Sequence, residues 1–190
     1  ATVEEDCELI PEALEEFRGG ILDYARDSTK SLSEITASIY TAISAGVDYK
    51  DSIGAITIAE KLAVAGRADL ESTTNVLVST LNAYGLGMDQ AARFSDVLFT
   101  TVKNGQTTLP ELSENMSKVT QSASTLGIPI ETVAAALATL TAQGVPTTQA
   151  MTALKAIMTA YIKPTTQAAT EAKNLEIAFG AQAIKSKGLT

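Results

Sequence analysis

The spacing of single glycines is the feature that most constrains the fold of this 190-residue chain. Two interleaved series recur at intervals of 39 or 42 residues: Gly66, Gly105 and Gly144, and Gly46, Gly85 and Gly127. A segment of about one helix separates each glycine from the next. Because a self-similar period of about 20–50 residues is typical of repeated supersecondary units, we expect neighbouring repeats to stabilise one another by stacking. This organisation favours a function based on shape and packing over one based on an active site.

Apolar residues between these glycines recur at helical spacing, and valine and isoleucine do not alternate as they would in strands. We therefore predict an all-α fold, an array of antiparallel helical hairpins with about seven to nine helices and a repeat of roughly 39 residues. The array is either solenoid-like or an irregular bundle. The expected helices cover residues 11–27, 31–45, 49–65, 69–83, 88–103, 108–126, 129–143, 146–162 and 165–179. The residues after Gly180 are expected to be a helix or a strand.

The chain divides into three expected parts: an acidic N-terminal helix over residues 1–28, a helical-repeat domain over 31–164, and a C-terminal helix with a truncated tail over 165–190. The first helix has a weak point at Gly19-Gly20. Its apolar stripe is Cys7, Ile10, Leu14, Phe17, Ile21 and Tyr24. That stripe either docks onto the rest of the domain or pairs with a helix of a partner.

Helix-capping residues mark several of these boundaries. Ser31 with Glu34, and Thr108 with Glu111, have the spacing of capping boxes. Thr147 or Thr148 is expected to cap a later helix. The glycines that close the helices are expected to adopt left-handed conformations, as at Gly46. A positive φ at Gly105 would make Gly105→Val destabilising by a few kcal/mol.

Composition excludes several classes of function. The chain has no histidine, the commonest general base and metal ligand. Its 14 basic and 22 acidic residues give a net charge of −8, which argues against binding to nucleic acid. The single cysteine, Cys7, is expected to be a small apolar residue at least half-buried, with a redox or intermolecular role as the alternative. No run of apolar residues is long enough to span a bilayer.

The motifs tested for chemistry have structural interpretations. The acidic runs Glu4-Glu5-Asp6 and Glu15-Glu16 lack the loop pattern of a calcium site and are interpreted as solvated helix faces. Gly85-Leu86-Gly87 lacks the remaining residues of a phosphate-binding loop. No motif supports Lys103 or Lys118 as a substitute base, and the four methionines are interpreted as core: Met88, Met116, Met151 and Met158. We therefore predict no catalytic, cofactor-binding or metal-binding residue, and no enzymatic activity.

The chain lacks an initiator methionine, and its first ten residues are acidic where a signal peptide would be basic. We expect it to be a piece of a longer protein or a processed product. We expect no transmembrane segment within it.

A distinctive series of segments runs through the chain. It consists of residues 80–86 (TLNAYGL), 91–105 (AARFSDVLFTTVKNG), 107–112 (TTLPEL), 131–146 (ETVAAALATLTAQGVP) and Lys163-Pro164. Over Thr73–Pro164 this series resembles the conserved domain of phage tail tape-measure proteins. Weaker matches at 44–47, 61–66 and 185–189 extend the resemblance from about Ser31 to Leu189.

The resemblance implies a structural role in phage tail assembly and length determination, with a further role in genome ejection. The implied partners are tail-tube proteins, tail-tip or baseplate proteins, assembly chaperones and other copies of the chain. The implied locations are the virion tail and, during assembly, the host bacterial cytoplasm. Two alternatives stay open: a cellular helical-repeat scaffold that binds a partner protein, and a membrane-active protein whose alanine-rich hairpins insert into bilayers.

Overall fold

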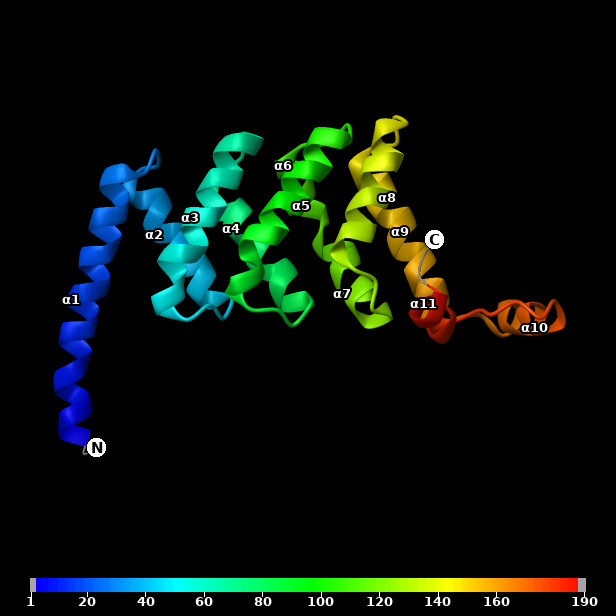
Figure 1. Cartoon of the computed structure of the whole chain (residues 1–190), viewed down its shortest axis with the longest axis horizontal. Coiled ribbons are helices and arrows are strands. Elements are labelled where there is room, and N and C mark those ends of the chain that lie inside the picture. Colours follow the sequence, from blue (N-terminus) through cyan, green and yellow to red (C-terminus); the bar gives the residue numbers. More distant parts are fainter. Residues whose placement is uncertain (1–2, 188–190) are drawn as a thin grey trace.

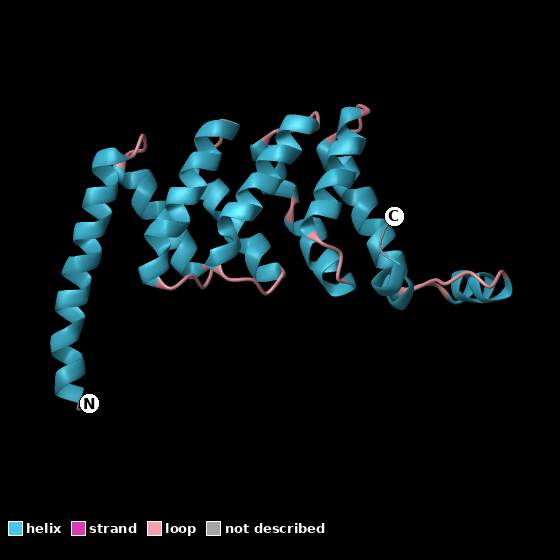
Figure 2. Ribbon diagram, viewed as in Figure 1, coloured by secondary structure: helices cyan, strands magenta, loops and turns pink. Residues whose placement is uncertain are grey.

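The computed structural model describes the backbone of residues 3–187 and the side chains of residues 13–185. Over these residues the chain consists of helices and connecting turns, without strands, which confirms the all-α prediction (Figures 1 and 2). The elements are α1 (Val3–Asp27), α2 (Leu32–Ser44), α3 (Tyr49–Gly66), α4 (Leu70–Ala83), η1 (Met88–Gln90), α5 (Ala91–Asn104), α6 (Leu109–Asn115), α7 (Ser117–Leu126), α8 (Ile130–Ala142), α9 (Thr147–Ile162), α10 (Thr166–Asn174) and α11 (Ala181–Lys187).

The helices from α1 to α9 run up and down in turn and form two layers (Figure 1). One layer contains α1, α3, α5 and α8, and the other contains α2, α4, the α6–α7 pair and α9. Each helix packs against its neighbour in the same layer and against helices of the other layer. The core lies between the layers and includes Ile35, Ile56, Leu77, Leu81, Phe94, Leu98, Leu112, Val119, Leu137 and Met151.

Three consecutive hairpins repeat the same plan: α3–α4, α5–α7 and α8–α9. Their first helical elements begin at Tyr49, Met88 and Ile130, so the structural period is 39 and then 42 residues. The glycine before each hairpin has a positive φ: Gly46 (96°), Gly85 (65°) and Gly127 (70°). These three are the positions where the chain turns back at the end of one hairpin, and the left-handed conformation predicted at Gly46 is confirmed.

The prediction of a positive φ at Gly105 is wrong, because this residue is extended with φ −101° and ψ 165°. Glycine occupies this position because of close packing and not because of backbone conformation. A Cβ atom there would lie 2.5 Å from Thr141 Oγ1 and 3.1 Å from the Cα of Ala138. Gly66 is similar, since a Cβ would lie 2.9 Å from the Cβ of Leu109, and the left-handed residue is instead Arg67, with φ 52°. Glycine is therefore required at Gly66 and Gly105 for close packing between hairpins.

Both predicted capping boxes are confirmed. The side chains of Ser31 and Thr108 accept hydrogen bonds from the backbone N–H groups of Glu34 and Glu111, whose carboxylates accept from the cap residues in return. The expectation that Thr147 or Thr148 caps a helix is wrong, because the N-cap of α9 is Pro146 and makes no side-chain hydrogen bond. The Thr147 side chain faces the preceding hairpin instead.

Several helix boundaries differ from the prediction. The helix expected over residues 165–179 ends at Asn174, and the one expected from residue 88 begins with the 3-10 turn η1 before α5 starts at Ala91. Helix α1 begins at Val3 rather than near Pro11, since glutamate, leucine and alanine on both sides of the proline favour helix. The helix expected over residues 108–126 is divided at Met116. The side chain of Asn115 donates to the Glu111 carbonyl oxygen at 2.8 Å, where it competes with the backbone for an acceptor. With this division and the short α11, the described residues form eleven α-helices.

The two ends of the array differ in shape. The first half of α1 extends beyond the other helices at one end, and α10 projects from the opposite end along the long axis (Figure 1). The chain returns from α10 to the array, where Phe179 contacts Tyr161 with 4.6 Å between ring centroids and Ile184 is buried. No residue of α10 is buried.

Candidate functional site

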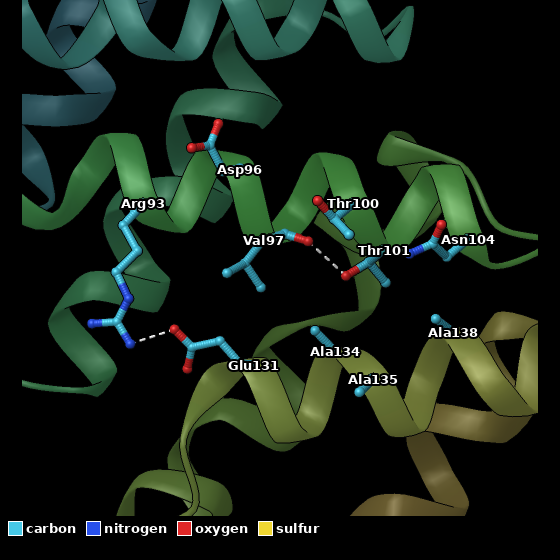
Figure 3. Close-up of a pocket in the computed structure, with 10 residues that line it drawn as sticks. All are labelled: Arg93, Asp96, Val97, Thr100, Thr101, Asn104, Glu131, Ala134, Ala135 and Ala138. Carbon is cyan, nitrogen blue, oxygen red and sulfur yellow. Dashed lines mark hydrogen bonds and ion pairs between the residues drawn. The ribbon is translucent and has the colours of Figure 1, made fainter.

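A groove of about 460 Å³ lies between α5 and α8, at the joint between the second and third hairpins (Figure 3). Side chains from the two helices face each other across it. The lining residues are Arg93, Asp96, Val97, Thr100, Thr101 and Asn104 from α5, and Glu131, Ala134, Ala135 and Ala138 from α8.

The floor of the groove is shallow because α8 presents alanines there. Ala135 is exposed and Ala138 half-buried, and neither reaches far toward α5. On the opposite wall, Thr101 is buried and donates a hydrogen bond to the Val97 carbonyl oxygen at 2.8 Å (Figure 3). Because that hydroxyl donates within its own helix, the groove offers mainly methyl groups and a polar rim.

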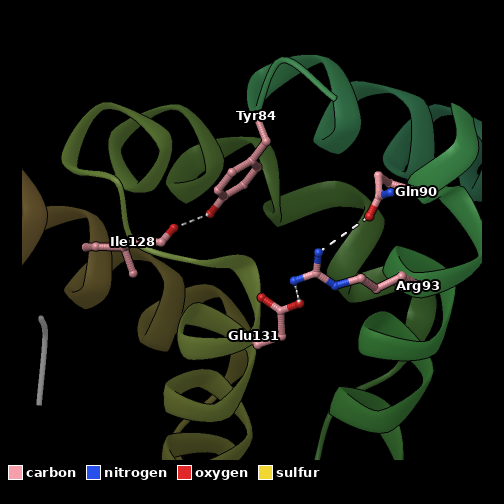
Figure 4. Close-up of polar contacts among 5 residues, drawn as sticks. All are labelled: Tyr84, Gln90, Arg93, Ile128 and Glu131. Atoms are coloured by element: carbon pink, nitrogen blue, oxygen red, sulfur yellow. Dashed lines mark hydrogen bonds and ion pairs between the residues drawn. The ribbon is translucent and has the colours of Figure 1, made fainter. Parts of the chain in front are cut away.

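One end of the groove is closed by an ion pair between Arg93 and Glu131, and Arg93 also approaches Gln90 (Figure 4). The side chains of Arg93 and Glu131 are 57% and 40% exposed. Exposed ion pairs contribute about 0–1 kcal/mol to the free energy of unfolding. This pair therefore orients α5 and α8 relative to each other more than it stabilises their contact.

Tyr84 forms a further link, from the end of the first hairpin to the turn that precedes the third. Its hydroxyl donates to the Ile128 carbonyl oxygen at 3.1 Å (Figure 4). Its ring meets that of Phe94 edge to face, with 6.0 Å between centroids. Burial, with a smaller effect of the Glu131 charge, raises the pKa of Tyr84 to about 12. The hydroxyl therefore stays protonated at neutral pH. Its hydrogen bond connects the end of α4 to the turn before α8.

A buried carboxylate anchors the end of α1. Glu60 of α3 accepts hydrogen bonds from the hydroxyls of Tyr24, Ser28 and Thr29 and from the Thr29 backbone N–H, the last at 2.8 Å. Burial alone would raise the pKa of Glu60, but the hydrogen bonds from Tyr24, Thr29 and Ser28 outweigh it and lower the pKa to about 2. The cluster joins α1 and the α1–α2 turn to the array.

A similar cluster connects α6 to α9. Glu111 Oε2 lies 2.8 Å from the Thr147 hydroxyl and 3.2 Å from the Thr107 hydroxyl, and it also accepts the Thr108 backbone N–H at 3.3 Å. The hydrogen bond from Thr147, followed by those from Thr107 and Thr108, lowers the pKa of Glu111 in spite of burial. Thr147 thus connects two hairpins, which explains why it is not a cap.

The residues tested for chemistry are placed as follows. Glu15 pairs with Arg18 at 3.3 Å on the exposed face of α1, and Lys103 lies in the last turn of α5. Gly85-Leu86-Gly87 forms the turn between α4 and η1. The interpretation of the methionines as core is confirmed, since Met116, Met151 and Met158 are buried and Met88 packs against the core. Cys7 and Glu4-Glu5-Asp6 lie outside the described side chains.

Sequence reasoning missed the clusters around Glu60 and Glu111 and the joint at Arg93 and Glu131. A weak signal existed for Glu60, because this residue falls beside the apolar stripe that includes Ile56, Ala59 and Ala63. The residues that meet it are at least 31 positions away in the sequence. No local pattern indicates such partners.

These clusters join helices to one another and close helix ends. The carboxylates with lowered pKa, Glu34, Glu60, Asp69 and Glu111, accept hydrogen bonds at helix ends or between helices. Structural networks of this kind perturb pKa values without catalysis. Among the described residues, no three histidine, cysteine, aspartate or glutamate side chains converge as metal ligands would. Of the helices in the described part, none is long and apolar enough to cross a membrane.

Comparison with known proteins places the chain in a phage context. The sequence profile of the family described as "Phage-related minor tail protein" matches residues 18–190. A "Probable tape measure protein" of Clostridium phage phiCD119 is 32% identical over 125 residues, which are 64% of this chain and 13% of that protein. The "Tape measure protein" of Pneumococcus phage Dp-1 is 24% identical over 144 residues, which are 76% of this chain and 12% of that protein.

The chain thus spans only about an eighth of the length of these two curated relatives. No solved structure matches it significantly. The two-layer array described above therefore has no experimental counterpart among the comparisons.

Proposed function

Because the chain belongs to the family of phage-related minor tail proteins, we propose that it is a structural segment of a tail tape-measure protein that acts in tail assembly and length determination. The match to the family over residues 18–190 is the observation that carries this proposal. The two similar tape measure proteins support it. The carboxylates with lowered pKa, Glu60 and Glu111, join helices to one another, which agrees with a structural role.

In this role the segment works in the virion tail, after assembly in the host bacterial cytoplasm. Its partners are tail-tube proteins, tail-tip or baseplate proteins, assembly chaperones and further copies of itself. It is not an enzyme, and it takes part in genome ejection as a component that moves with the DNA rather than as a nucleic-acid-binding protein. Its net charge of −8 agrees with the last point, because DNA phosphates repel an acidic surface.

The proposal is tested in the phage that encodes the chain. Residues 88–129, one complete hairpin with its turn, are duplicated in frame, so that each copy meets the neighbours it has in the array. We expect longer tails in electron micrographs, by roughly 10 Å if the added hairpin stays folded in the array and by roughly 60 Å if it is drawn out as a single helix.

A matched phage carrying Gly54→Ala controls for the genetic manipulation, because this exposed glycine has no neighbouring atom within 4 Å of an added Cβ. Its tails should keep the parental length. Tails of parental length in the duplication phage, produced in normal number, would contradict a role in length determination.

A helical-repeat scaffold that binds a partner protein is the second candidate, and the groove between α5 and α8 is the observation that favours it. Ala135→Arg would fill this groove from an exposed position without disturbing the core. A scaffold function predicts a clear loss of infectious particles with unchanged thermal stability. Normal yield would leave the groove without a role in assembly.

A further inference from the structure

An asparagine followed by a glycine lies at the joint between the second and third hairpins. Asn104 is the last residue of α5, and it is exposed at the end of the α5–α8 groove away from Arg93 (Figure 3). Asparagine before glycine is the pair most prone to spontaneous deamidation, because glycine has no Cβ atom to hinder its own backbone nitrogen. We propose that Asn104-Gly105 is a deamidation site, which the closed α5–α8 joint protects and which reacts when that joint opens.

The reaction needs only these two residues and water. The backbone nitrogen of Gly105 gives up its proton to water or hydroxide and attacks Cγ of Asn104. A C–N bond forms, the bond from Cγ to Nδ2 breaks, and the amide group takes up a proton and leaves as ammonia, so that a five-membered imide remains. Water then opens this ring. Attack at Cγ gives aspartate, and attack at the main-chain carbonyl carbon gives isoaspartate, in which the main chain runs through Cβ and Cγ.

The sequence favours this reaction at Asn104 over every other amide side chain. The four other asparagines precede residues that carry a side chain: Val76, Ala83, Met116 and Leu175. Gln143 precedes a glycine, but a glutamine must close a six-membered ring, which forms more slowly. We therefore expect the first product of deamidation in this chain at Asn104.

The folded structure restrains both reacting groups. Asn104 is helical, and the Gly105 N–H donates to the Thr101 carbonyl oxygen at 2.9 Å. Gly105 is also held against α8, since a Cβ there would lie 2.5 Å from Thr141 Oγ1 and 3.1 Å from the Cα of Ala138. Ring closure requires the nitrogen to leave Thr101 and the main chain to rotate out of the helix, and the contact with α8 leaves no space for that rotation. The rate should therefore follow the population in which the joint is open.

The products change the joint permanently. Isoaspartate adds one methylene group to the main chain directly before Gly105, where an additional carbon has no space. Both products also place a negative charge at the C-terminal end of α5, which the helix dipole disfavours. A chain that has opened and reacted therefore closes less well than an unreacted one. The inference concerns the chain itself and does not depend on the proposed function.

Ageing of the 190-residue chain in mildly alkaline buffer tests the proposal. Peptide mapping by mass spectrometry locates the reacted residue, and a methyltransferase specific for isoaspartate identifies that isomer. Deamidation at Asn104 should be roughly tenfold or more slower in the folded chain than in urea-unfolded chain. Exchange of the Gly105 amide hydrogen requires the same hydrogen bond to open. The slowing of deamidation should therefore be at least as large as the protection of this hydrogen against exchange.

Matched variants separate the effect of the joint from that of the sequence pair. Asn104→Gln keeps an amide but removes the five-membered ring, so it should give little product at this position in either state. Thr141→Leu places a larger side chain against Gly105 and should speed deamidation of the folded chain by about threefold or more. Thr152→Leu makes the same substitution at an exposed position of α9 and should react like the parent chain.

Circular dichroism checks that each variant keeps its helical content. Should Thr141→Leu fail to fold, urea below the unfolding midpoint opens the joint of the parent chain instead and should speed the reaction in the same way. Asn104→Asp supplies the charge of the products without the added methylene, and the isoaspartate form should melt at a lower temperature than this variant.

Several results would overturn the proposal. Equal rates in the folded and unfolded chains, or protection of the Gly105 amide hydrogen larger than the slowing of deamidation, would show that the joint does not restrain the reaction. Absence of product at Asn104 in the unfolded chain would reject the site itself. A folded Thr141→Leu variant that reacts no faster than Thr152→Leu would reject the part of α8, and an isoaspartate form as stable as Asn104→Asp would reject the lasting change in the joint.

Discussion

At the scale of single residues, glycines at one sequence period perform two different tasks. Gly46, Gly85 and Gly127 turn the chain with positive φ at the end of a hairpin. Gly66 and Gly105 lie where helices of successive hairpins touch, and their missing side chains allow that approach. Gly144, which continues the series of Gly66 and Gly105, performs the first task instead, since its φ is 88° and no atom lies within 4 Å of an added Cβ. The period indicated where the chain turns between helices. It did not separate the two tasks, because contact between hairpins is not a local property of the sequence.

This distinction predicts opposite effects for two glycine substitutions. Gly105→Ala should lower the free energy of unfolding by about 1–3 kcal/mol, because the new Cβ would collide with Thr141 Oγ1 and the Ala138 backbone. Gly54→Ala should raise the free energy of unfolding by about 0.5–1 kcal/mol. Gly54 lies on the exposed face of α3, away from the helix ends, and has open space around it. Urea denaturation measures both, and equal effects would contradict the packing explanation.

A buried hydroxyl gives a second prediction at this scale. Ser38 is fully buried in α2, and its Oγ has no hydrogen-bond partner among the described residues. An unsatisfied buried group carries a desolvation cost, so Ser38→Ala should stabilise the chain by about 1 kcal/mol. The matched Ser52→Ala should destabilise it by about 0.5–1.5 kcal/mol, because the Ser52 hydroxyl is equally buried and donates to the Tyr49 carbonyl oxygen at 2.6 Å. A loss of stability in both variants would indicate a missed partner for Ser38.

At the scale of helices, local signals predicted some boundaries correctly and missed others. The capping boxes at Ser31 and Thr108 placed two helix starts correctly, since every atom of a capping box lies within four residues. The break at Met116 was missed because the apolar stripe runs through it without interruption. The predicted start near Pro11 was wrong, because the one backbone hydrogen bond that a proline removes does not end a helix of otherwise favourable residues.

The candidate site was less predictable than the helices. The sequence indicated that no catalytic cluster should be expected, but it could not identify the joints at Glu60, Glu111 and Arg93. Each of these joints depends on which helices meet, and on their rotation about their own axes. That information comes from packing of the whole array, and the α5–α8 groove exists only because alanines of α8 happen to face α5.

The anchor of α1 should respond to pH with a defined sign. The pKa of Glu60 is about 2 in the folded chain and ordinarily 4.5, so the unfolded chain binds the proton more readily. The stabilisation is therefore complete above pH 4.5 and is lost as the pH falls from 4.5 towards 2. Glu60→Gln should cost about 1–3 kcal/mol at pH 7 through weaker hydrogen bonds from Tyr24, Ser28 and Thr29.

The difference in unfolding free energy between the parent chain and Glu60→Gln should shrink below pH 4.5. Hydrogen exchange should show the loss concentrated in α1, because Glu60 joins this helix to α3. The exposed residue Glu114 supplies the control, and Glu114→Gln should change stability little at either pH. A constant difference between the Glu60 variant and its parent from pH 7 to pH 3 would contradict the assignment of the anchor to the ionised carboxylate.

At the scale of the whole molecule, contacts between neighbouring hairpins replace a single central core. Helix α5 packs on α3 and α8, and α7 packs on α4 and α9, so each hairpin depends on the next. Alanine, serine and threonine are common at these joints and bury little apolar area per turn. Since repeats of this type are stable only when several stack, loss of a terminal hairpin should weaken the hairpin that it packs against.

The linear arrangement makes a quantitative prediction for the duplication of residues 88–129 in the isolated chain. One added hairpin contributes one helix to each layer, and packed helices lie about 8–10 Å apart. The maximum dimension measured by small-angle X-ray scattering should therefore grow by about 10 Å, with no change in the cross-section. An irregular bundle would instead thicken with little gain in length, and an unfolded insert would lower the fractional helicity seen by circular dichroism. Growth in length alone, with helicity maintained, follows only if the repeats stack in a row, because only then does each new hairpin meet the same two surfaces as the one before it.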